Sequence, residues 1–312
     1  MRTKVLLYDP LSWLRNAGFF LLGASFYIAL HGTAGMGSLG IALLGFLLAY
    51  TSVYFFNDLL DYRRDVKDEV KKLYKPLISG EASKKSFVLI SMLYALSGIS
   101  LSFYFGTFFG LMVSLLLFLN VLHSTVFRAN RTVRSVSIMV IEFVKISLGW
   151  FAFSSLLTGF PFLFVVFVCM LYSFGYRLYK TDLKNVVSER NMLFSAMLKG
   201  GANKAYTFVM LASFLLSFLI YPFRLPLLIF LAFAALNMIA QKKIKLSGEG
   251  SKSFVKNLNF SHLVVIICCF VLILGFIGIA VSPEMAQLNG AMGQAVEPLS
   301  SAVYSFWMGI FK

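Results

Sequence analysis

Long apolar runs alternate with short polar segments along nearly the whole chain. A transmembrane helix needs roughly 20 predominantly apolar residues. By that criterion the sequence predicts nine spans, at about 12–31, 38–57, 86–105, 107–126, 135–154, 160–179, 205–221, 224–241 and 261–281. No repeat of fixed period and no second compositional zone interrupts the pattern. We therefore expect an all-α polytopic membrane protein with a single domain over residues 1–312.

Basic residues are concentrated in alternate loops of this predicted bundle. The segments 58–85, 127–134, 180–204 and 242–260 hold most of the Lys and Arg residues, whereas the loops on the opposite side carry almost none. Because basic loops stay in the cytoplasm, this asymmetry predicts an N-terminus inside and a C-terminus outside. The segment from Pro283 to Lys312 is either an amphipathic helix in the outer interface or a loosely ordered end.

The composition supports a membrane protein and argues against a nucleic-acid-binding protein and against a fold held by disulfides or zinc. The chain is 59% apolar, with a mean hydropathy of +0.82. The net charge of +15 reflects basic loops on the cytoplasmic side and their attraction to anionic lipid head groups. We expect no nucleic acid as partner. The three Cys residues lie in apolar runs without paired or ligand-like spacing, so we expect neither disulfides nor a zinc site; they are Cys169, Cys268 and Cys269.

The second predicted span ends in a group of acidic residues at helical spacing. Asn57, Asp61 and Asp65 stand at i, i+4 and i+8, and Asp58 lies one turn from Asp61. On a helix all four side chains can line one face. Oxygen ligands in this arrangement suit Mg²⁺, which takes further ligands from water and phosphate. The pattern predicts a metal-diphosphate site on a solvated helix end at the membrane surface.

The alternative is an acidic helix end that is simply bathed in water. The segment Lys75-Pro76-Leu77-Ile78-Ser79-Gly80 favours the metal site, because it follows at a distance that closes a loop back to the membrane.

Ionisable residues inside predicted spans include Arg15, Glu142 and Lys145. Arg15 is near the start of the first span, and Glu142 and Lys145 stand at i and i+3 in the fifth. Charges at bilayer depth are costly and usually face a cavity or a partner. Either Glu142 and Lys145 neutralise each other, or Lys145 reaches a phosphate with support from Glu142. Arg128, Arg131 and Arg134, on the short loop before that span, either ring the same opening or are the basic residues of a cytoplasmic loop.

The sixth span ends in a polar face. Tyr172, Tyr176 and Lys180 stand at i, i+4 and i+8, and Asp182 lies at the cytoplasmic mouth. This face is either a second wall of the metal site or an interfacial aromatic belt with basic anchors.

Nine spans, with Asn57-Asp58-x-x-Asp61-x-x-x-Asp65 and the Lys75-Pro76-Leu77-x-Ser79-Gly80 turn, resemble the UbiA family of intramembrane prenyltransferases. The resemblance implies a cytoplasm-facing, lipid-open cavity in which Mg²⁺ holds the diphosphate of a polyprenyl donor. It implies metal ligands at Asn57, Asp58, Asp61, Asp65 and Asp182 and diphosphate partners at Arg15, Arg128, Lys145 and Lys180. Asp58, Asp61, Lys145 and Tyr176 are then the catalytic candidates.

The chain departs from the family pattern at the second motif. Most members have two Asp residues four apart, whereas here Asp182 is followed by Leu183-Lys184-Asn185-Val186, with Glu189 as the next acid. Trp13-Leu14-Arg15-Asn16 resembles a motif of the polyprenyl-phosphate phosphoribosyltransferase branch, in which a polyprenyl phosphate is the acceptor. Two alternatives to prenyl transfer therefore stand: phosphoribosyl transfer, and a degenerate member that binds lipid or a partner without turnover.

Overall fold

The computed structural model describes residues 10–31, 36–67, 75–127, 131–182, 201–220 and 269–278, with isolated positions between and beyond them. Over these residues the chain is helical, and no strand occurs among them. The elements are α2 (Pro10–His31), α3 (Met36–Asp65), α5 (Lys84–Phe105), α6 (Thr107–Leu122) with a π-helical turn (His123–Phe127), α7 (Arg131–Phe151), α8 (Phe162–Asp182), α10 (Gly201–Ile220) and a short apolar helix (Cys269–Gly278). The predicted all-α class is confirmed.

Four of the described helices are long and apolar enough to cross a membrane: Leu11–His31, Gly37–Asp65, Lys84–Phe105 and Thr107–Phe127. The chain is an integral membrane protein. The predicted span at 224–241 lies almost entirely outside the described residues, as does most of the C-terminal segment, so the count of nine remains a prediction. The helix α3 continues to Asp65, well past the expected end of its span, and carries the acidic residues with it.

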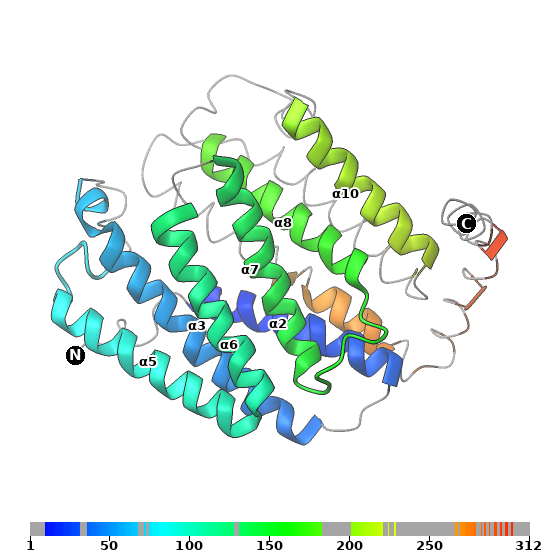
Figure 1. Cartoon of the computed structure of the whole chain (residues 1–312), viewed down its shortest axis with the longest axis horizontal. Helices are drawn as coiled ribbons and strands as arrows, with labels where there is room; N and C mark the ends of the chain where they lie inside the picture. Colours follow the sequence, from blue (N-terminus) through cyan, green and yellow to red (C-terminus); the bar gives the residue numbers. More distant parts are fainter. Residues whose placement is uncertain are drawn as a thin grey trace.

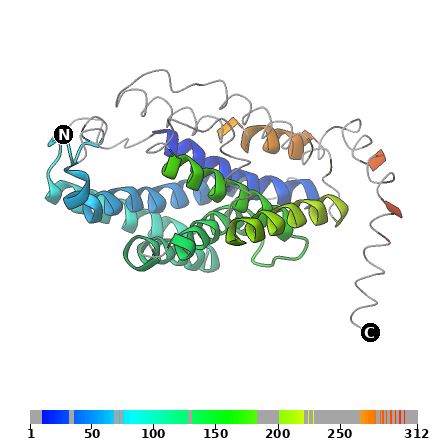
Figure 2. The ribbon, with the colours of Figure 1, turned by 90° about the horizontal axis from the view of Figure 1, so that it is seen from above.

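The helices form a row in which α2 takes an inner position. α5 packs against α3 and α6, α6 against α7, α7 against α8, and α8 against α10 (Figure 1). α2 lies against α7 on one side and against the Cys269–Gly278 helix on the other, where the Phe26 and Phe276 rings are 4.6 Å apart (Figure 2). The burial of each helix follows from this arrangement: 61% of the α2 span is buried, against 22% of α5. Large apolar side chains on α5 and α6, such as Leu96 and Phe118, are exposed, as expected of a lipid-facing surface.

Glycines allow α2 and α7 to approach closely. A Cβ at Gly23 would overlap the carbonyl oxygen of Ile146, and a Cβ at Gly149 would overlap that of Phe20. Each helix therefore presents a glycine to the backbone of the other, as small residues do at many helix contacts in membranes. This contact brings the polar residues of α7 next to those near the start of α2.

Candidate functional site

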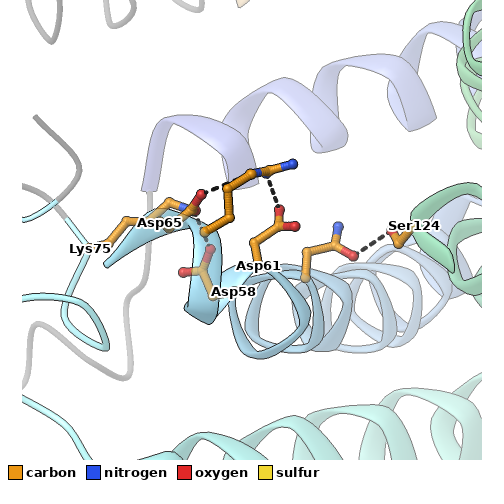
Figure 3. Close-up of polar contacts among 7 residues, drawn as sticks. Asp58, Asp61, Asp65, Lys75 and Ser124 are labelled. Atoms are coloured by element: carbon orange, nitrogen blue, oxygen red, sulfur yellow. Dashed lines mark hydrogen bonds and ion pairs between the residues drawn. The ribbon is translucent and has the colours of Figure 1, made fainter. Parts of the chain in front are cut away.

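The acidic end of α3 forms the outer part of the site (Figure 3). At about 100° per residue, Asn57, Asp61, Asp65 and Asp58 fall in that order across an arc of about 100° of the helix surface. The expected shared face therefore exists, with Asn57 at one edge and Asp58 at the other. The expected solvation is wrong for two of the residues, because Asp58 and Asp65 are only 5% and 1% exposed.

Lys75 is the reason that these two carboxylates are buried. Its Nζ donates to Asp58 Oδ1 at 2.6 Å and to Asp65 Oδ2 at 2.8 Å, so one ammonium bridges two acids seven residues apart (Figure 3). Burial alone would lower the pKa of Lys75, but the charge of Asp58 and the hydrogen bonds to both acids raise it above its usual value. Lys75 is therefore a stable cation at neutral pH.

The turn after Lys75 is fixed to the helices beneath it. The amides of Ile78 and Ser79 donate to the Lys75 carbonyl at 3.0 and 2.9 Å, and Gly80 takes a positive φ of 78° that favours glycine. Leu77 is buried in a cluster with Phe55 of α3 and with Phe87 and Ile90 of α5. The Lys75-Pro76 segment thus lies beside the end of α3 and the start of α5.

The other two polar residues at the end of α3 have different partners. Asp61 Oδ2 lies 3.1 Å from Arg64 Nη2, and the Arg64 side chain is largely exposed. Asn57 Oδ1 accepts a hydrogen bond of 2.6 Å from Ser124 Oγ in the π-helical turn after α6 (Figure 3). Within the described part of the chain, no three His, Cys, Asp or Glu residues converge closely enough to hold a metal ion. The acids instead form ion pairs with Lys75 and Arg64.

A second polar cluster lies buried between α2, α3 and α7. Tyr54 stands one helical turn before Asp58, and its hydroxyl accepts from Arg15 Nη2 at 3.1 Å and from Asn16 Nδ2 at 2.7 Å. Lys145 Nζ donates to Asn16 Oδ1 at 3.2 Å and to Glu142 Oε1 at 2.8 Å. The two clusters are therefore adjacent along α3, with the acidic one nearer the loop.

The two predicted cations Arg15 and Lys145 thus belong to one cluster. The Lys145 Nζ also lies 4.2 Å from the centre of the Tyr50 ring, a distance typical of a cation–π contact. Glu142 Oε2 is buried and accepts no hydrogen bond from the described residues, so the cluster can accept one more donor. Sequence reasoning missed Tyr50 and Tyr54, although both continue the four-residue spacing that leads to Asp58.

The remaining predicted residues are described only in part. Tyr176, Lys180 and Asp182 lie on the last turns of α8, whose final helical residue is Asp182, but their side chains lie outside the described part. Arg128 and Glu189 also lie outside the described residues. Figure 1 shows that α3 and α8 end on the side of the bundle where α7 begins.

Comparisons with known proteins agree on one family and one fold. The model of the UbiA prenyltransferase family matches residues 17–264. A UbiA homologue from Aeropyrum pernix K1, solved without ligand, aligns with a TM-score of 0.61 at 16% identity, covering 84% of this chain and 97% of that chain. A UbiA homologue from Archaeoglobus fulgidus bound to GPP and Mg²⁺ aligns with a TM-score of 0.57 at 16% identity, covering 86% and 98%. No curated protein sequence matches the chain.

Proposed function

The chain belongs to the UbiA prenyltransferase family, and on that premise we propose that it is a Mg²⁺-dependent intramembrane transferase. It moves a polyprenyl group from a polyprenyl diphosphate to an acceptor. The observation that carries the proposal is the adjacency of the two clusters along α3. Asp58 stands one turn after Tyr54, which contacts Arg15, and Lys145 joins the same buried cluster through Asn16. In the proposed complex the acids would hold the metal of the diphosphate, and the buried cations would face the diphosphate from the side on which the prenyl tail enters the lipid.

The residues at the end of α3 fit a magnesium ion by the chemistry of their donors. Mg²⁺ prefers oxygen ligands and is usually held by one or two carboxylates, waters and substrate phosphates. Two of the acids already hold the ammonium of Lys75 between them, so the site favours a cation. No three of the described acids converge on one point, so we propose that Asn57, Asp58, Asp61, Asp65 and, from α8, Asp182 would share the metal through waters and diphosphate oxygens, with one or two carboxylates as direct ligands of each ion. The Archaeoglobus fulgidus homologue bound to GPP and Mg²⁺ supports this choice of metal.

The buried cations would bind the diphosphate from the membrane side. In the proposed reaction the bond between C1 of the prenyl chain and the diphosphate oxygen breaks, and the electron pair remains with the diphosphate. Arg15 and Lys145 stabilise this growing negative charge, with Arg128 and Lys180 as proposed further partners. Bound Mg²⁺ would neutralise part of the same charge. The acceptor then forms its new bond to C1.

Aromatic side chains would shelter the positive charge that develops on C1. The Tyr50 ring already faces the ammonium of Lys145, so it lies where a cation is stabilised. We propose that Tyr176 on α8 contributes in the same way from the opposite wall. No covalent intermediate with the enzyme is needed for this direct transfer.

Release of diphosphate tests the proposed function directly. Purified protein is incubated with a mixture of isoprenyl diphosphates and a membrane lipid extract as the source of acceptor. We expect release of diphosphate that requires Mg²⁺ and stops with a chelator. A parallel reaction contains phosphoribosyl diphosphate and a polyprenyl phosphate, and release in that reaction alone favours phosphoribosyl transfer. No Mg²⁺-dependent release in either reaction would favour a family member that binds lipid without turnover.

We also propose that nine spans surround a cytoplasm-facing cavity that is open to lipid, with the N-terminus inside. The support is the concentration of Lys and Arg in alternate loops. In a background without native Cys residues, a Ser251→Cys variant should react with a membrane-impermeant maleimide only when the reagent reaches the cytoplasmic face. Labelling from the outer side alone would show that the span count or the orientation is wrong.

A further inference from the structure

We propose that Lys75 competes with the divalent cation for Asp58 and Asp65, so that the metal binds by exchange with an ammonium that the protein itself supplies. The inference rests on the proposed metal site. It concerns how that site is loaded, and it assigns a role to the first residue of the Lys75-Pro76 turn.

Lys75 occupies one oxygen of each buried acid, and Arg64 Nε lies 3.4 Å from the other oxygen of Asp65. The single Nζ atom is 2.6 Å from Asp58 and 2.8 Å from Asp65, and the Lys75 side chain is only 14% exposed. A carboxylate that is almost fully buried needs a partner charge, because an unpaired buried charge is strongly destabilising. Any other cation that takes Asp58 and Asp65 as ligands must therefore replace the ammonium as well as provide its own charge.

We expect this exchange to move only the lysine side chain. The turn after Lys75 is held by its own hydrogen bonds and by the buried side chains of Leu77 and Ile78. The lysine side chain, by contrast, is a flexible four-carbon stem with a compact charge at its tip. Rotation about its side-chain bonds is sufficient to move the ammonium away from the carboxylates. The displaced cation stays close to the site, where a diphosphate can accept hydrogen bonds from it.

The rival explanation is a permanent counter-ion that fixes the turn to α3 and never leaves. The two explanations predict opposite effects on metal affinity. Removing a permanent counter-ion relieves its repulsion of the metal but also unpairs two buried acids and distorts the site, so that metal binding weakens or stays unchanged. Removing a competitor strengthens metal binding, because the apparent affinity of a site that is only partly available rises when it becomes fully available.

Direct binding of Mn²⁺, without any substrate, tests the inference. Mn²⁺ prefers the same oxygen ligands as Mg²⁺, and its electron paramagnetic resonance signal reports the free ion. We compare the wild type with Lys75→Gln, which keeps a hydrogen-bond donor but loses the charge. The expected result is an affinity for Mn²⁺ about tenfold higher in the variant, the size expected when a site about one-tenth available becomes fully available.

Two controls separate competition from other effects of the substitution. Lys85→Gln removes the same charge from an exposed position at the start of α5, and its Mn²⁺ affinity should stay within about twofold of the wild type. Lys75→Arg keeps the charge, so it should bind Mn²⁺ no more tightly than the wild type. Thermal unfolding gives a second readout. Lys75→Gln should unfold earlier than the wild type without metal, and Mn²⁺ should raise its unfolding temperature by more.

The outcomes distinguish this inference from the proposed function. If the wild type binds Mn²⁺ and Lys75→Gln binds it equally or more weakly, the competition is wrong and the metal site stands. Tight binding by Lys75→Arg, matching Lys75→Gln, would also overturn the inference, because the charge would then be irrelevant. If neither the wild type nor Lys75→Gln binds Mn²⁺, the metal site itself is wrong.

Discussion

Asp61→Ala is expected to reduce Mg²⁺-dependent diphosphate release by at least about a thousandfold, the loss that follows when several kcal/mol of metal-assisted stabilisation is removed from the transition state. Asp61 is the clearest of the acids to test. It contacts Arg64, whose side chain is largely exposed, whereas Asp58 and Asp65 hold the ammonium of Lys75 between them. Asp58→Ala should abolish activity as well, but this variant also removes one of the two carboxylates around Lys75.

Further variants test which acids contribute to the proposed metal site. Glu81→Gln removes an exposed acid from the same loop region and should leave activity unchanged. Under the proposed assignment, Asp182→Asn should raise the Mg²⁺ concentration needed for half-maximal rate before it lowers the rate at saturating metal, because a metal held by one acid on that side would keep more waters and bind more loosely. Near wild-type activity in both Asp58→Ala and Asp61→Ala would refute the metal assignment. If Asp182→Asn shows the same Mg²⁺ dependence as the wild type and Glu189→Gln is nearly inactive, the second wall of the site lies in the loop after α8.

Lys145→Met is expected to lower the free energy of unfolding by about 3 to 5 kcal/mol, the usual cost of removing one member of a buried ion pair. Lys145 is 1% exposed and Glu142 is 5% exposed, so the remaining carboxylate would lose its ion-pair partner inside the bundle. The measurement is unfolding of the purified protein in mixed micelles with increasing denaturing detergent. Loss of diphosphate release should accompany the loss of stability.

The double variant Glu142→Leu/Lys145→Met separates the structural role of the pair from its role in catalysis. It removes both charges, so most of the lost stability should return, as happens when buried ion pairs are replaced by apolar residues. Activity should not return, because the cation proposed to bind the diphosphate is gone. Recovery of both stability and activity would show that the two residues only neutralise each other.

The sequence predicts the elements of this protein well because its signals are local. The apolar runs mark the described helices, and the four-residue spacing correctly indicates that Asn57, Asp61 and Asp65 continue α3. Pairing between distant segments carries no such local signal. That Lys75 sits between Asp58 and Asp65 depends on how Leu77 packs under the turn. For the same reason, periodicity alone suggested a solvated helix end.

Partners across helices were equally inaccessible to sequence reasoning. The pair Glu142 and Lys145 is visible as an i, i+3 spacing within one helix. The contact of Lys145 with Asn16 depends on the approach of α2 to α7, which the glycines Gly23 and Gly149 permit. A glycine in an apolar run does not reveal which helix it will meet.

The contact between α2 and α7 also has a consequence for the biogenesis of the protein. Asn16 and Lys145 are separated by 129 positions, and at 5 to 20 residues per second a ribosome needs roughly 6 to 26 s to synthesise that stretch. The helix α2 therefore enters the membrane with a polar face whose partner on α7 does not yet exist. Tyr54 becomes available to it much earlier, when α3 emerges. We expect α2 to remain in a protected environment at the insertion machinery until α7 arrives, and a nascent chain that stops before Arg131 to lack the central packing of the bundle.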